Sequence, residues 1–91
     1  MQHLNTKKAQ IVIETLARII KEKREKQNKS QRLFAYEYGI QKSLLSRLEN
    51  GVNEPKIISI WTVCQALNIM PSELFKLVEK ELPKNFSLIE L

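Results

Sequence analysis

The stretch GIQKSLLSRLENG occupies residues 39–51 and is bracketed by Gly39 and Gly51, the only two glycines of the 91-residue sequence. The residues between them would form an α-helix of about three turns, about 16 Å long. Leu48, with either Leu44 or Leu45, gives that helix an apolar stripe. The side chains able to reach phosphates or base edges are Gln41, Lys42, Ser43, Ser46 and Arg47. The stretch therefore predicts a short helix with one buried face, of a length that fits one turn of a DNA major groove.

Two helices are predicted before this stretch. Apolar residues at helical spacing and an uninterrupted charged run predict a helix over about 7–27, with Thr6 as its N-cap. This helix should end near Asn28, because asparagine tolerates the left-handed conformation that helix ends commonly use. A second helix is predicted over 31–38, with Ser30 as its N-cap.

Two more helices are predicted after Gly51. The stretch 57–67 is rich in β-branched residues, yet its apolar residues recur every three to four positions, which favours a helix with Trp61 in the core. A proline suits the first position of a further helix over about 71–82. The tail over 83–91 alternates loosely between polar and apolar residues. It could form a short strand, or an arm that packs on a partner.

The whole sequence indicates one all-α domain of five helices. We expect an N-terminal extension over 1–13 that continues into the first helix, a main domain over 14–82 and the tail after it. No apolar run approaches the roughly 18 residues of a membrane span, and the polar N-terminus does not resemble a signal peptide. Cys64 is the only cysteine, so it has no internal disulfide partner. We therefore expect a cytoplasmic protein. Cys64 also lies on the apolar stripe of the helix predicted over 57–67, so we expect its thiol in the core.

Charge is divided unevenly along the chain, whose net charge is +5. Residues 18–47 contain nine Lys or Arg against three Glu, whereas residues 48–91 contain four Lys against six Glu. A basic face of this kind suits a polyanionic partner such as nucleic acid. A solvated basic surface is the alternative, and the charge alone does not decide between the two.

No catalytic or metal-binding pattern stands out in the sequence. His3 has no histidine or cysteine companion, so no metal site is expected there. Glu79 and Glu81 do not share a helix face, and no nucleophile has a candidate base beside it. We therefore expect neither an enzyme nor a bound cofactor.

Residues spread in one register over about sixty positions carry a family resemblance. They are Arg24, Ser30, Gln31, Ala35, Gly39, Ile40, the run from Leu45 to Gly51, Pro55, Ala66, Leu67, Glu73, Leu74 and Phe75. In these positions the sequence resembles the Cro and phage-repressor-like helix-turn-helix regulators, also called the XRE class. The resemblance implies a lambda-repressor-like fold. It also implies a bacterial or phage transcriptional regulator that binds a palindromic operator as a homodimer, with the third helix in the major groove.

The resemblance further implies roles for individual residues. Base-edge contacts fall on Gln41, Lys42, Ser43, Ser46 and Arg47. Phosphate contacts fall on Arg24, Ser30, Gln31 and Asn50. Gly39 and Gly51 form the turn and the stop around the third helix, and an ion pair between Arg24 and Glu49 braces it. The dimer contact falls on the tail and on Leu74, Leu77 and Val78.

Three other functions are compatible with the sequence. The chain could be an antitoxin whose tail also binds a toxin, or the controller of a restriction–modification operon. It could also be a protein-interaction module that does not bind DNA. The exposed polar residues expected over 41–47 argue against this last function.

Overall fold

The computed structural model describes residues 6–89, and this part of the chain contains five helices and confirms the all-α class. The helices are α1 (Thr6–Lys26), α2 (Gln31–Tyr38), α3 (Lys42–Asn50), α4 (Ile57–Ala66) and α5 (Pro71–Glu81). Thr6 is the first residue of α1 and not its N-cap, a one-residue shift that is common at helix ends. His3 and the last two residues of the tail lie outside the described residues. Among the helices described, none combines the length and the apolar character needed to cross a membrane.

Left-handed residues follow the first four helices. Asn28, Gly39, Gly51 and Asn68 have φ angles of 58°, 66°, 62° and 60°. After α3, the N–H of Gly51 donates to the carbonyl oxygen of Leu48 at 3.4 Å, and the N–H of Val52 donates to that of Arg47 at 3.3 Å. This pair of bonds is the Schellman pattern, which needs a residue with positive φ. The predicted breaks between helices are confirmed.

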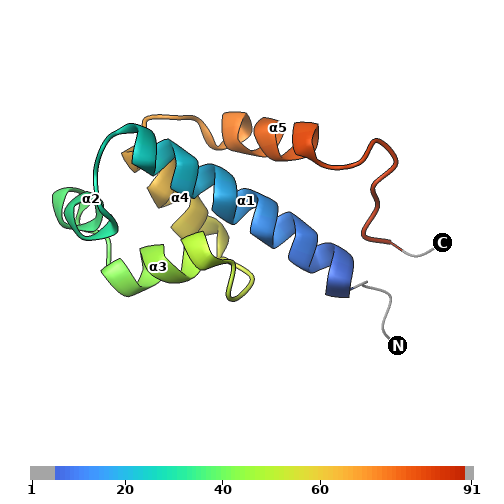
Figure 1. Ribbon diagram of the computed structural model, residues 1–91, viewed down its shortest axis with the longest axis horizontal. Coiled ribbons are helices and arrows are strands. Elements are labelled where there is room, and N and C mark those ends of the chain that lie inside the picture. The colour runs from blue at the N-terminus through green and yellow to red at the C-terminus, as the bar shows by residue number, and fades with distance from the viewer. Residues whose placement is uncertain (1–5, 90–91) are drawn as a thin grey trace.

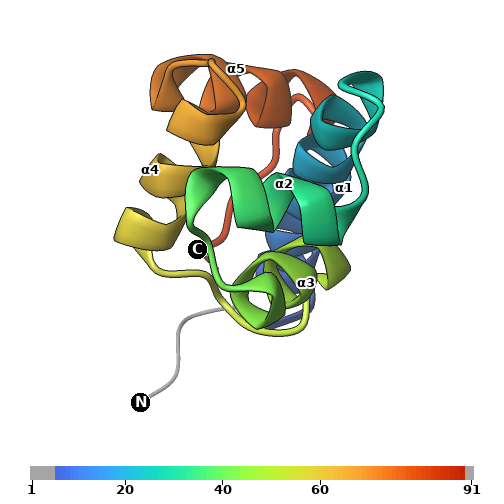
Figure 2. The ribbon, with the colours of Figure 1, turned by 90° about the vertical axis from the view of Figure 1, so that its left-hand side faces the viewer.

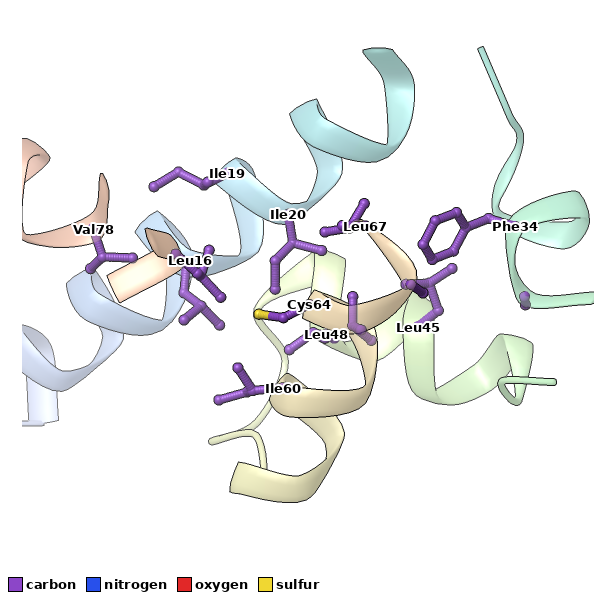
Figure 3. Packing of buried hydrophobic residues seen from close by; sticks show 14 residues of the cluster. Leu16, Ile19, Ile20, Phe34, Leu45, Leu48, Ile60, Cys64, Leu67 and Val78 are labelled. Atoms are coloured by element: carbon purple, nitrogen blue, oxygen red, sulfur yellow. The ribbon is translucent and has the colours of Figure 1, made fainter. Parts of the chain in front are cut away.

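α1 is the longest helix, and the others are arranged around it (Figure 1). α3 and α5 pack along α1, and α2 packs on α3 (Figures 1 and 2). The core draws side chains from all five helices (Figure 3). Its fully buried members include Ile20, Phe34, Leu45, Cys64 and Leu74. The expectation that Cys64 is a core residue is confirmed.

The expectation that Trp61 is a core residue is wrong, because half of its surface is exposed. α4 buries Ile60, Val63 and Cys64. Trp61 follows Ile60 directly, so it lies about 100° further round the helix from the residue that enters the core.

Two of the three apolar residues expected at a dimer contact are instead buried within one chain. Leu74 is 0% exposed and Val78 is 2% exposed, while Leu77 is half-buried. Leu74 and Val78 belong to the core cluster, and Leu77 packs against it. Leu74 and Val78 are therefore unavailable to a partner, and the predicted dimer contact on them needs correction.

The described part of the tail, residues 83–89, contains no strand. It turns after α5, where the N–H of Phe86 donates to the carbonyl oxygen of Pro83 at 3.0 Å. Leu88 then lines a hollow together with Ala9 and Val12 of α1. The tail thus returns to the beginning of the first helix.

Candidate nucleic-acid interface

α3 lies at the surface beside α2 (Figure 2). It buries Leu45, Leu48 and Glu49. Its N-cap Gln41 is exposed, and so are Lys42, Ser43 and Arg47, whereas Ser46 is half-buried. Four of the five residues predicted to contact bases therefore share the open surface of one short helix.

Asn50 and Ser46 lie one helical turn apart on α3, and the structure brings them together. The Nδ2 atom of Asn50 donates to the Oγ atom of Ser46 at 3.3 Å. Asn50 is exposed. The two side chains thus support one another next to Arg47, on the side of α3 that faces away from the core.

Hydrogen bonds fix both ends of α2, the second of them at the short turn that leads to α3. The Oγ atom of Ser30 accepts from the N–H of Leu33 at 3.1 Å and so caps α2, as predicted. At the other end, the N–H of Ile40 donates to the carbonyl oxygen of Ala35 at 2.9 Å. Ala35 is 3% exposed, so a larger side chain there would push the packed helices apart.

A buried ion pair joins α3 to α1. The Nε and Nη2 atoms of Arg24 donate to the two carboxylate oxygens of Glu49, at 2.7 and 2.9 Å. The Glu49 side chain is 0% exposed and the Arg24 side chain is 8% exposed. The hydrogen bonds to Glu49 raise the pKa of Arg24, although burial acts in the opposite direction. A two-point contact of this kind fixes orientation as well as distance.

The placement of Arg24 corrects its second predicted role, as a phosphate ligand. Its Nη1 atom donates to the carbonyl oxygen of Lys29 at 2.6 Å, so all three guanidinium nitrogens have partners inside the protein. Arg24 therefore binds the carboxylate of Glu49 and not the phosphate that was expected.

Gln31 also belongs to this network, which the sequence analysis missed. Its Nε2 atom donates to the Oε1 atom of Glu49 at 2.9 Å. Gln31 and Glu49 are 18 residues apart, and only the packing of α2 on α3 brings them together. The first residue of α2 and the end of α3 are therefore held by the same carboxylate.

Two further polar residues lie beside Arg47 and were not predicted. A hollow of about 340 Å³ lies between α3 and the beginning of α4, and Arg47, Asn53 and Lys56 are among the residues that line it. Lys56 is the N-cap of α4, and its side chain makes no capping hydrogen bond within the described residues. A lysine in a position that usually favours a small polar cap was the available sequence signal.

An apolar surface lies on α4 and α5. We call it the α4–α5 apolar face and define it by the exposed side chains of Ile57, Trp61, Met70 and Phe75. These side chains line a hollow of about 480 Å³ in which Ser72 is the only polar lining residue described. Exposed large apolar side chains gathered in one place indicate a contact surface.

Comparisons with known proteins agree with this architecture. A model of the helix-turn-helix family matches residues 20–74, which is more than half of the chain. A crystal structure of a mutant of the restriction–modification controller protein C.Esp1396I has a similar fold. It has a TM-score of 0.69 and 20% sequence identity, with 82% of this chain and 95% of that chain covered. A search of curated proteins finds no match. The chain belongs to the helix-turn-helix family of DNA-binding transcriptional regulators, in the Cro and phage-repressor-like class.

Proposed function

We propose that the protein binds a palindromic operator as a homodimer and places α3 in the major groove of each half-site. The observation that carries the proposal is a helix braced on one face and open on the other. The Glu49 side chain, which is 0% exposed, links α3 to Arg24 of α1. Lys42 and Arg47 remain exposed on the same helix. A side chain that must match a base edge benefits from a helix that does not move.

Base discrimination falls mainly on Arg47 in this proposal. Arginine pairs with the O6 and N7 atoms of guanine, and such a contact is worth about 1–3 kcal/mol of discrimination. Gln41, Lys42 and Ser43 supply further base or phosphate contacts from the first turn of α3. Glutamine suits adenine, and lysine suits guanine.

Phosphate contacts come from both sides of α3. On one side lie Ser30 and Gln31, where the N-terminus of α2 adds backbone N–H donors. On the other side lie Asn53 and Lys56, in the hollow that Arg47 also lines. Asn50 is exposed beside Ser46 at the end of α3 and supplies a further contact. The proposal thus assigns DNA binding to the domain over 14–82.

We assign the dimer contact to the α4–α5 apolar face and not to Leu74 and Val78. The core already uses those two side chains, whereas Trp61 and Phe75 are 50% and 45% exposed. Two copies related by a two-fold axis would present two α3 helices to half-sites about 34 Å apart. Leu88 of the tail lines a hollow together with Ile57 and Phe75 of this face, so we assign to the tail an extension of the dimer contact or the binding of another protein.

Selection of duplexes from a random DNA pool tests the proposal. We expect enrichment of a two-fold symmetric motif at which Arg47→Ala loses preference at one base pair of each half-site. Lys84→Ala is the matched control, because it removes one exposed positive charge from the tail. Enrichment of no sequence by the purified protein would favour the protein-interaction function instead. A motif located beside restriction–modification genes would identify a controller protein.

Sedimentation tests the dimer assignment. Trp61→Lys should shift the protein from dimer to monomer, because it introduces a charge into the α4–α5 apolar face. Tyr36→Lys is the control, since Tyr36 is an 83% exposed aromatic residue on α2. A Trp61→Lys protein that remains dimeric would place the dimer contact elsewhere.

A further inference from the structure

We propose that Gln10, in the first turns of α1, is a positioning residue for the C-terminal turn of α3, which carries Arg47, and for the loop that follows it. The inference rests on the proposed function, because the position of α3 matters only if α3 contacts DNA. Gln10 precedes residues 20–74, the part of the chain that the family model matches. Its role therefore follows from the contacts that it makes in this structure and not from the family.

The evidence is a hydrogen bond between residues 41 positions apart in the sequence. The Nε2 atom of Gln10 donates to the carbonyl oxygen of Gly51 at 2.9 Å. That oxygen belongs to the same peptide group as the N–H of Val52, which donates to the carbonyl oxygen of Arg47. The carbonyl oxygen of this peptide group is therefore bound by Gln10, and its N–H closes the last turn of α3.

Two neighbouring residues of α1 support this contact. The Nε2 atom of Gln10 also donates to the Oε2 atom of Glu14 at 3.2 Å, which orients the amide. Gly51 is buried, and a Cβ atom built on it would lie 3.6 Å from Glu14 Cα and 3.7 Å from Ile13 Cγ2. α1 thus packs directly against the end of α3 as well as bonding to it.

The Gly51–Val52 peptide group stands between two parts of the proposed DNA surface. Before it is the turn that carries Arg47, and after it is the loop that leads to Asn53 and Lys56. These three residues line one hollow, so their relative position depends on the direction in which the chain leaves α3. With Gln10 holding this peptide group, the N-terminal turns of α1 set that direction.

The test compares Gln10→Met and Gln10→Glu with the wild-type protein. Methionine keeps the length of the side chain but loses the donor, and glutamate adds a second carboxylate beside Glu14. Operator affinity should fall about 2- to 12-fold in Gln10→Met, the factor expected for one net hydrogen bond. It should fall further in Gln10→Glu. The ratio of operator affinity to scrambled-duplex affinity should fall with it, and amide exchange at Val52 should accelerate more than at Leu48.

Thr15→Val is the matched control. The Oγ1 atom of Thr15 donates to the carbonyl oxygen of Ile11 within α1, so this variant loses a hydrogen bond without loosening α3. Far-ultraviolet circular dichroism establishes that each variant is folded at the assay temperature. If Gln10→Met keeps both the affinity ratio and the Val52 exchange rate of the wild type, the inference is overturned and the proposed function stands. If the wild type itself prefers no duplex, both fail.

Discussion

Breaking the ion pair between Arg24 and Glu49 should cost a large share of the stability of this domain. The Glu49 carboxylate is 0% exposed and accepts three donors, two from Arg24 and one from Gln31. Arg24→Met removes two of the three donors and leaves a buried anion with Gln31 alone. Loss of one partner of a buried pair costs about 3–5 kcal/mol. A chain of this length has a total free energy of unfolding of about 5–14 kcal/mol, so the loss amounts to about a fifth of the total or more.

Urea unfolding followed by circular dichroism measures this effect. Arg24→Met and Glu49→Leu should each lower the free energy of unfolding by about 3–5 kcal/mol. The double variant should lose far less than the sum, because it leaves no unpaired buried charge. Arg18→Met is the control: it breaks an exposed ion pair between α1 and Glu81 of α5, and exposed pairs contribute little. Single variants that lose less than about 1 kcal/mol, or a double variant that loses the full sum, would refute the reasoning.

Two further predictions concern the glycines and the cysteine. Gly39→Asn should be tolerated, because asparagine accepts positive φ and nothing lies within 4 Å of a Cβ at that position. Gly51→Asn should lower the urea midpoint clearly more, because its side chain must fit against α1, 3.5 Å from a Glu14 atom; equal midpoints would contradict this. Burial raises the pKa of Cys64, so its contribution to stability is complete below the thiol pKa of the unfolded chain, about 8.5, and is lost as pH rises through the folded pKa. Alkylation of Cys64 should therefore be slow in the native protein and fast in denaturant, and fast native alkylation would contradict its burial.

Local signals determined where the helices lie. Asn28, Gly39, Gly51 and Asn68 adopt positive φ where the sequence predicted helix ends, because the cost of that conformation depends on one residue and its immediate neighbours. The Ser30 cap follows from the same local chemistry. Thr6 was misplaced by one residue, which is the usual uncertainty at a helix end.

The candidate interface was only partly accessible from the sequence. Helical spacing placed Lys42, Ser43 and Arg47 on the outer face of α3, and the family resemblance suggested the contact between Arg24 and Glu49 that the structure contains. The exposure of Lys56 beside Arg47 could not be inferred, because the loop between α3 and α4 has no periodicity that would assign its residues to a face.

Tertiary packing alone decided which apolar residues the core uses and which polar groups meet across the chain. Trp61 and Leu74 both belong to apolar helical stripes, yet Trp61 is half exposed and Leu74 is buried, since each helix can turn only one narrow face to its neighbours. Gln31 reaches Glu49, and Gln10 reaches Gly51, over 18 and 41 residues of sequence. The sequence by itself determined the helices, their ends and the polar character of α3. The relative positions of α1, α2 and α3 determined how α3 is held, because hydrogen bonds at such separations exist only after the helices have packed.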